Sequence, residues 1–429
     1  MMAGKNAMFM QLRLSRYRLI GIAAVLASIV AGCGGREDSG EAFEVSRIDS
    51  PAAPGSLSPH LAVTFDDRAV LSWLEPTAGE AHAVRYSILD GDRWTPPVTV
   101  AQNDGWFVNW ADVPSVVPLT ADLWMSHWLV KRPGGTYSYD IAMSMSADGG
   151  VEWGPPLTPH TDGTATEHGF VSLFPWSGDV GAVWLDGRNM PPDGGAEKPA
   201  GDGQNYGGMT LRYARLTVDG AIQEAGEIDS LVCDCCQTDI AVTASGPVVV
   251  YRDRTSDEIR DISVARYADE GWLAPLTVSD DQWHIPACPV NGPAIAAAGN
   301  SVIVAWYANP KGASRIKVAW SDDAGRTFSA PILIEKDGVG GRVDVTMMAS
   351  GSAVVSWVGK TADSGAELRM RHVNSAGDLG PVRVIAAGEY SRSAGFPQMI
   401  RAGDRLIYAW PEPGEPRRIL TAASPLADG

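Results

Sequence analysis

An apolar segment that ends in an aromatic residue recurs seven times along the chain, and this repeat restricts the possible folds more than any other feature. The aromatic residues recur at intervals of 51 to 67 residues, which is the length of about four short strands with their turns. Each segment follows another apolar segment and a Gly or Asp turn, as in a hairpin. The seven aromatic residues are Trp73, Trp128, Trp184, Tyr251, Trp306, Trp357 and Trp410.

The repeat predicts an all-β protein, a β-propeller of four-stranded blades, with seven blades favoured and six as the alternative. The composition agrees, because 47 Gly, 29 Pro and 15 Trp favour short strands and tight turns over helices. The seventh unit ends early and lacks a fourth strand. Residues 43–48 (FEVSRI) precede the first unit, so we expect them to supply that strand and close the ring. The predicted propeller domain spans residues 43–429.

Asp-containing turns follow the third predicted strand of several units. The two clearest copies contain Ser146, Asp148, Gly150 and Trp153 in one unit and Ser321, Asp323, Gly325 and Phe328 in another. In such a turn the Asp caps its own backbone, the Gly adopts a positive φ, and the aromatic residue packs between sheets. The pattern resembles the Asp-box, S-x-D-x-G-x-x-W, of bacterial neuraminidase repeats. The chain therefore resembles the sialidase-like β-propeller superfamily.

The resemblance implies a site on the face where the loops that lead into each first strand surround the central channel. Sialidases hold a substrate carboxylate with three arginines, use a Tyr activated by Glu as nucleophile, and use an Asp as acid/base. The residues that match these roles by position are Arg188, Arg254 and Arg342, Tyr390 with Glu167 or Glu389, and Asp239. The Phe/Tyr-Arg-Ile-Pro signature of sialidases is absent from the sequence. An ion pair with a neighbouring Asp is the alternative role for each arginine.

The N-terminal segment has the pattern of a secretory signal. Four basic residues precede an apolar stretch at residues 19–30, which is too short to span a bilayer. It ends in Val30-Ala31-Gly32-Cys33, which resembles the lipobox of bacterial lipoproteins, with a plain signal peptide as the alternative. We therefore expect a signal peptide at residues 1–32, lipidation of Cys33 and a flexible tether at residues 33–42. Gly34 favours the outer membrane, facing the periplasm or the exterior.

The net charge of −17 argues against nucleic acid as a partner, because phosphates repel a polyanion. We expect a monomer that binds a glycan or a small acidic ligand and reaches the membrane only through its lipid anchor. An exo-glycosidase of the sialidase type and a structural or metal-handling protein are the alternatives. The Gly- and Pro-rich insertion at residues 189–208 is predicted to be a mobile loop on the channel face, with a surface insertion that has no functional role as the alternative.

Four cysteines besides Cys33 occur within two neighbouring predicted loops. Thiols and an imidazole so close together could bind a soft metal such as Zn or Cu. In an oxidising compartment disulfide bonds are the alternative, for example Cys236–Cys288, or a vicinal Cys235–Cys236 bridge. No cofactor is certain from the sequence. The candidate ligands are Cys233, Cys235, Cys236, Cys288 and His284.

Overall fold

The computed structural model of the protein describes residues 43–190, 207–389, 391 and 395–426. The chain divides into two units, Met1–Ala42 and Phe43–Gly429, and the description below concerns the second. The predicted signal peptide, the tether with Cys33, Tyr390 and most of the 189–208 insertion lie outside the described residues. Among the described residues, no helix combines the length and the apolar character that crossing a membrane requires.

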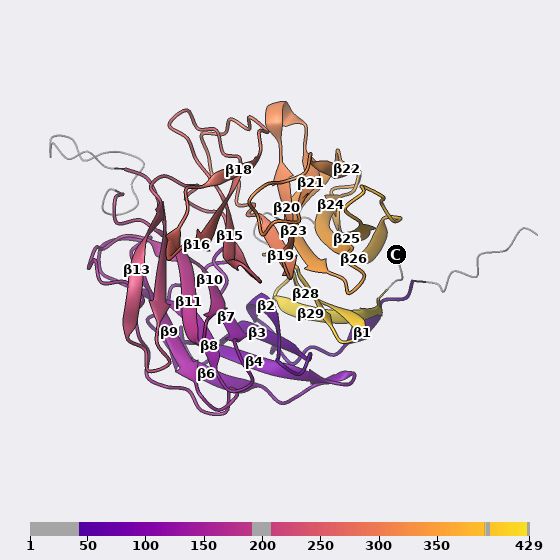
Figure 1. Ribbon diagram of the computed structural model, residues 1–429. Helices are drawn as coiled ribbons and strands as arrows, with labels where there is room; N and C mark the ends of the chain where they lie inside the picture. The colour runs from indigo at the N-terminus through magenta and orange to yellow at the C-terminus, as the bar shows by residue number, and fades with distance from the viewer. Residues whose placement is uncertain (1–42, 191–206, 390, 392–394, 427–429) are drawn as a thin grey trace, which may run out of the picture. The chain divides into compact units, whose positions relative to one another are not determined.

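Seven antiparallel sheets follow one another along the described chain and form the blades of a propeller (Figure 1). Blade 1 comprises β2 (Leu57–Val63), β3 (Ala69–Pro76), β4 (His82–Asp90), β5 (Arg93–Trp94) and β6 (Val98–Asn103). Blade 2 comprises β7 (Ser115–Pro118), β8 (Trp124–Lys131) and β9 (Tyr139–Ser146). Blade 3 comprises β10 (His168–Trp176), β11 (Asp179–Asp186), β12 (Thr210–Leu216) and β13 (Ile222–Asp229).

The remaining blades continue in the same order, and one short 3-10 helix, η2 (Pro310–Gly312), interrupts them. Blade 4 comprises β14 (Asp239–Thr243), β15 (Gly246–Arg252), β16 (Ile262–Ala268), β17 (Gly271–Trp272) and β18 (Leu276–Ser279). Blade 5 comprises β19 (Ala294–Ala298), β20 (Ser301–Ala308), β21 (Arg315–Ser321) and β22 (Ile332–Lys336). Blade 6 comprises β23 (Val339–Met347), β24 (Ala353–Lys360), β25 (Gly365–Val373) and β26 (Arg383–Glu389). Blade 7 comprises β27 (Gln398–Ala402), β28 (Arg405–Glu412), β29 (Arg418–Pro425) and β1 (Ser46–Ile48).

The two ends of the described domain meet in blade 7. Strand β1 pairs antiparallel with β29, in a register that places Ser46 opposite Ala423. The hydroxyl of Thr421 strengthens the joint by donating to the carbonyl of Ile48 (2.8 Å). Trp94 of blade 1 in turn donates to the Thr421 hydroxyl (3.1 Å), which ties the last blade to the first. The predicted closure and the count of seven blades are confirmed.

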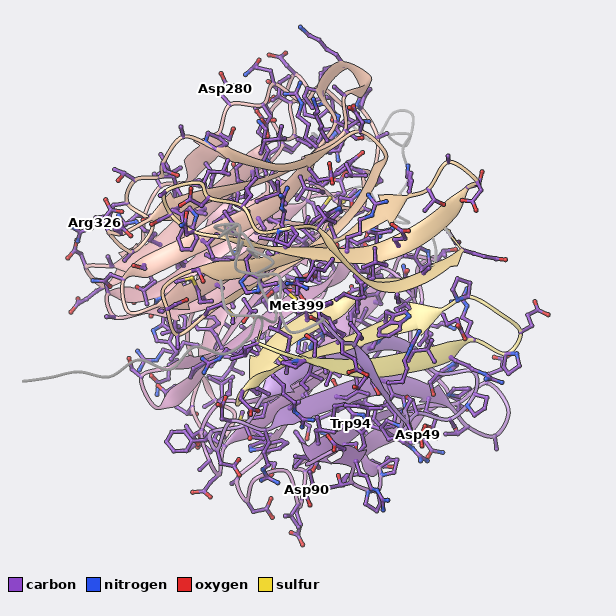
Figure 2. All side chains as sticks on the ribbon, turned by 90° about the vertical axis from the view of Figure 1, so that its right-hand side faces the viewer. Asp49, Asp90, Trp94, Asp280, Arg326 and Met399 are labelled. Carbon is purple, nitrogen blue, oxygen red and sulfur yellow. The ribbon has the colours of Figure 1, made fainter. Side chains whose placement is uncertain are left out.

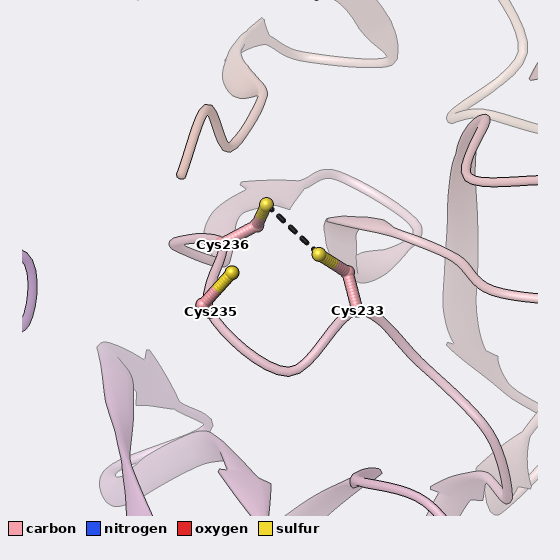
Figure 3. A group of neighbouring side chains, drawn as sticks. All are labelled: Cys233, Cys235 and Cys236. Carbon is pink, nitrogen blue, oxygen red and sulfur yellow. Dashed lines mark hydrogen bonds between the residues drawn. The ribbon is translucent and has the colours of Figure 1, made fainter. Parts of the chain in front are cut away.

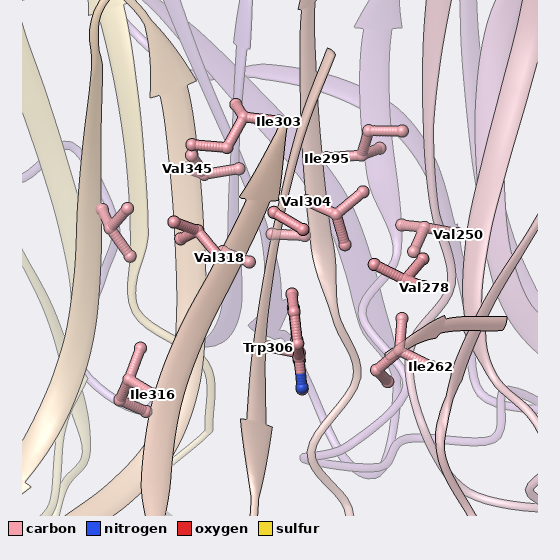
Figure 4. Close-up of a cluster of buried hydrophobic side chains, with 14 of the residues drawn as sticks. Val250, Ile262, Val278, Ile295, Ile303, Val304, Trp306, Ile316, Val318 and Val345 are labelled. Carbon is pink, nitrogen blue, oxygen red and sulfur yellow. The ribbon is translucent and has the colours of Figure 1, made fainter. Parts of the chain in front are cut away.

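The second strand of each blade carries the main core residues. Trp73, Trp184, Trp306 and Trp357 are essentially inaccessible to solvent, and each comes from the recurring aromatic position. Figure 4 shows Trp306 among aliphatic side chains of blades 4, 5 and 6, including Val250 and Val345. Removing about 200 Å² of each indole from water contributes on the order of 5 kcal/mol. The core therefore lies between blades, where the aromatic repeat of the sequence places it.

The two predicted Asp-boxes adopt the same local structure. The hydroxyl of Ser146 donates to Asp148 (2.7 Å) and accepts the N–H of Gly150 (2.8 Å), and Ser321, Asp323 and Gly325 repeat both distances. Both turns follow the third strand of their blades, as expected. In Figure 2, Arg326 next to the second turn points outward, whereas Met399 on β27 is buried.

Candidate functional site

The first strands of all seven blades surround one central cavity of about 290 Å³. First strands of neighbouring blades, such as β2 and β27 or β19 and β23, contact one another around it. The wall mixes aliphatic, aromatic and polar side chains, as small-molecule sites do. Its main polar and aromatic lining residues are His60, Asp112, Phe170, Gln237, Asp239, Arg342, Asp344 and Phe396.

Three aspartates, of which Asp112 is buried and Asp239 and Asp344 are half-buried, link neighbouring blades across this cavity wall. Each lies in or just before the first strand of blade 2, 4 or 6, and its carboxylate accepts a backbone N–H from the first strand of the next blade. The bonds join Phe170 to Asp112 (2.9 Å), Ile295 to Asp239 (2.8 Å) and Met399 to Asp344 (2.7 Å). Asp239, predicted as the acid/base residue, is thus one of three aspartates that join neighbouring blades. The resemblance to sialidases did not suggest this structural role.

Burial changes the protonation of these carboxyl groups. It raises the pKa of Asp112 to about 8, that of Asp344 to about 7 and that of Asp239 to about 6. Repulsion from Glu167 adds to the rise at Asp112. Near neutral pH the Asp112 carboxyl is therefore mainly protonated, and its Oδ1 atom has no hydrogen-bond partner among the described residues. The cavity presents a neutral carboxyl group there rather than an anion.

Glu167 forms a hydrogen-bonded pair with a tyrosine, but not with the one that the resemblance implied. The hydroxyl of Tyr139 donates to its carboxylate (2.5 Å), and burial raises the pKa of Glu167 to about 7. Tyr139 is fully buried, with its ring stacked on Phe107 at a centroid distance of 4.1 Å. A ligand in the cavity therefore does not reach the Tyr139 oxygen in this conformation. The predicted partner Tyr390 lies outside the described residues.

Arg188 is held in a cluster of carboxylates and imidazoles between blades 2 and 3. Its guanidinium binds Asp186 through two hydrogen bonds of 2.7 Å and approaches Asp162 at 3.1 Å. The rings of His160 and His168 stack beside it at a centroid distance of 3.9 Å. These acidic and histidine side chains are spaced closely enough to hold a metal ion. The guanidinium contacts both aspartates, so the cluster has the character of an ion-pair network.

Arg254 and Arg342 are also engaged within the protein. Arg254 pairs with Asp234 (3.0 Å) and with Glu258 (2.5 Å). The guanidinium of Arg342 donates to the carbonyl of Val290 and lies over the ring of Phe396 at 4.1 Å. The three predicted arginines belong to blades 3, 4 and 6, and each has protein partners of its own. Internal partners, which the sequence left open as the alternative, account for much of the binding capacity of these side chains.

The cysteine cluster forms at the loop that leads into blade 4 (Figure 3). The sulfur atoms of Cys233 and Cys236 are 3.0 Å apart, and those of Cys233, Cys235 and Cys236 all lie within 4.8 Å of one another. No disulfide bond joins these three residues. Cys288, from the loop before β19, is exposed and makes its thiol contact with Cys235. His284 is exposed and does not belong to the group of close ligand atoms among the described residues.

The sequence reasoning missed two residues of this region. Asp112 was not singled out, although an Asp followed by Val or Ile recurs at the first strands of blades 2, 4 and 6. Tyr139 was not singled out either, because it lies on a third strand and meets Glu167 only through inter-blade packing. Comparing the residues at the first strands of alternate blades would have identified Asp112 from the sequence.

Comparisons with known proteins agree with this architecture. No family model matches the sequence, and no curated protein matches it. The phage phi92 endosialidase superimposes with a TM-score of 0.51 at 11% identity, covering 90% of this chain and 70% of its own. The polysaccharide lyase Uly1 superimposes with a TM-score of 0.51 at 9% identity, covering 91% of this chain and 93% of its own. A protein of unknown function from Dyadobacter fermentans DSM 18053 has a TM-score of 0.49 at 15% identity, covering 89% and 98%. The chain is a seven-bladed propeller whose fold is similar to that of sialidases and related carbohydrate-active enzymes.

Proposed function

We propose that the protein is a binding protein of the bacterial cell envelope, and that its central cavity takes a neutral, polyhydroxylated ligand such as a terminal sugar of a glycan. The observation that carries the proposal is the cavity wall. It combines a mainly protonated Asp112 with the polar side chains of Thr346 and Gln398, the amide of Gln237, which is held by Ala111 and Gly292, and the ring of Phe396. Sugars present hydroxyl groups and apolar C–H faces, which such a wall complements.

A neutral ligand fits this wall better than an acidic one. A clamp for a carboxylate needs guanidinium groups that are available to it. Arg188 and Arg254 are paired with carboxylates, and Arg342 is stacked on Phe396 and bonded to a backbone carbonyl. Asp239 and Asp344 add negative charge as the pH rises through about 6 and about 7, respectively, and then repel an anion further. The volume of about 290 Å³ is at the lower end of small-molecule sites, so one sugar ring is favoured over a polymer.

The cellular location completes the proposal. The basic and apolar segments before Cys33 support export and lipid attachment, and Gly34 supports retention at the outer membrane. The full chain should incorporate labelled palmitate and fractionate with membranes, whereas Cys33→Ser should do neither. If the wild-type protein is soluble and unlabelled, lipidation is contradicted and a plain signal peptide is the remaining interpretation.

Calorimetric titration with two ligand sets tests the binding function. One set contains neutral hexoses and N-acetylhexosamines, and the other contains sialic acid and hexuronic acids. We expect neutral sugars to bind, and to bind about tenfold more weakly at pH 9 than at pH 6, because the cavity carboxyls ionise over that interval. Tighter binding of the acidic set, cleavage of a glycoside, or no binding of either set would overturn the proposal.

A pair of substitutions locates the ligand. Thr346→Phe places a ring in the cavity, since Thr346 lines it from β23. Thr277→Phe makes the same change at an exposed position on β18. Binding should be lost in the first variant and retained in the second, with unchanged melting temperature in both. Equal binding by the two variants would place the site outside the cavity.

A further inference from the structure

Three thiols from a single four-residue segment converge within the loop that leads into blade 4. Cys233 and Cys236 are 0% and 1% exposed, and Cys235 lies between them at the same centre. Figure 3 shows all three side chains turned toward one another. Since the three sulfur atoms lie within 4.8 Å of one another, small side-chain rotations would bring each to about 2.3 Å from one common ion.

One buried guanidinium lies beside these sulfur atoms. The guanidinium of Arg260 is 3% exposed and donates to the sulfur of Cys233 (3.4 Å). Its other contacts are Glu258 (2.9 Å) and Asp234 (3.6 Å), and Asp234 also binds Arg254. A buried N–H donor beside a sulfur atom stabilises a thiolate and holds it in place, as outer-shell groups do in metal sites. The hydrogen bonds and ion pairs around Arg260 therefore hold the Cys233 sulfur atom in a fixed position.

Cys288 offers a fourth thiol from a different blade, next to Cys235 but outside the group of three mutually close sulfur atoms. It lies in the loop before β19 of blade 5 and interacts with Cys235. Because Cys288 is exposed while Cys233 and Cys236 are buried, the cluster opens to solvent on one side. That opening provides the path by which an ion can enter. None of the four cysteines lines the central cavity, so the cluster is separate from the sugar site proposed above.

We infer that Cys233, Cys235 and Cys236, completed by Cys288, bind one soft, thiophilic metal ion, either Zn²⁺ or Cu⁺. Thiolate sulfur is the ligand that both ions prefer, and both accept all-sulfur sites of three or four ligands. Each thiol that binds the ion releases its proton to solvent, and no atom changes oxidation state. The exposed His284 takes no part, although it stands only four residues before Cys288.

Metal analysis of the full chain tests the inference. The protein is purified under reducing, chelator-free conditions from cells supplied with zinc or with copper, and the metal content is measured by mass spectrometry. We expect close to one ion per chain, at least tenfold less in Cys235→Ser, and no loss in the matched control His284→Ala. X-ray absorption at the zinc or copper edge should show sulfur neighbours alone at about 2.3 Å, and the two supply conditions distinguish the two ions.

A second measurement on the wild type keeps the test decisive if Cys235→Ser fails to fold. Treatment of the folded, metal-loaded protein with a strong chelator should make the cluster thiols reactive to maleimide, whereas the loaded protein should resist labelling. Metal-free protein with reactive thiols from the outset would overturn the inference. Metal-free protein with two disulfide bonds would also overturn it and assign the cluster to covalent bridging of the loops.

Discussion

The buried carboxyl group of Asp112 should make the stability of this propeller depend on pH in a direction opposite to that of an ordinary ion pair. Burial raises its folded-state pKa to about 8, while an unfolded chain has a pKa near 3.9 for Asp. Between these values the folded protein binds a proton that the unfolded chain has lost. The stabilisation is therefore fully present below about pH 4 and is lost as the pH rises to about 8.

Asp112→Asn isolates this effect. The amide keeps an oxygen that accepts the N–H of Phe170, but it cannot ionise. The variant therefore does not lose stability through ionisation of a buried carboxyl group as the pH rises. Each pH unit between the two pKa values is worth about 1.4 kcal/mol. The variant should match the wild type near pH 4 and exceed it by up to about 4 kcal/mol at pH 7. With an unfolding entropy of about 2 cal/mol/K per residue, this difference corresponds to about 5 °C in the melting temperature.

Calorimetric melting curves at pH 4.5, 6, 7 and 8 provide the assay. The other titrating groups of the cavity are the same in both proteins, so they largely cancel from the difference between them. Asp49→Asn removes the same charge at an exposed position and is the matched control (Figure 2). A difference between Asp112→Asn and wild type that stays constant from pH 4.5 to 8, or that favours the wild type at pH 7, would refute the reasoning.

Three further predictions test the fold, the first with a control substitution. A Cβ at Gly292 would overlap the backbone carbonyl of Gln237, so Gly292→Ala should lower the free energy of unfolding by about 3 kcal/mol, while Gly271→Ala, with open space around it, should cost less than about 1 kcal/mol in urea titrations. Asp323→Ala removes the cap of an Asp-box and should cost about 1–2 kcal/mol without changing sugar binding; an equal loss of binding would contradict its structural role. Burial lowers the pKa of His127 to about 3, so its stabilising contribution is present above pH 6.5 and is lost as the pH falls toward 3. His127→Gln should flatten the fall of melting temperature between pH 7 and 4.5, and an unchanged slope would count against this assignment.

The blade architecture could be predicted because its causes are local. The recurring apolar segments, the Asp-box turns and the N-terminal strand each carry their own signal, and the structure confirms all three, with the strand formed over Ser46–Ile48 of the predicted 43–48. A blade needs apolar strands, tight turns and an adjacent blade to pack against. The residues that form these strands and turns recur at similar intervals along the chain. Even the inter-blade core could be anticipated, because the aromatic position recurs once in every blade.

The site depends on contacts between loops of different blades, and these the sequence does not encode locally. Placing residues on the channel face was possible, but whether Arg254 is available to a ligand depends on Asp234 and Glu258 beside it. The pairing of Tyr139 with Glu167 likewise arises only when β9 and the loop before β10 are packed together.

The cysteines show the same division between sequence and tertiary structure. The sequence placed all four in two neighbouring loops, and aligning the blades suggested Cys236 opposite Cys288. In the structure, the turn of the first loop brings Cys236 to Cys233 instead, and Cys288 meets Cys235. Strand order and turn type follow from periodicity and residue preference, so the sequence alone determined the propeller. Side-chain direction within a loop follows from what packs against it, so only the tertiary structure decided which carboxyls are buried and which sulfur atoms meet.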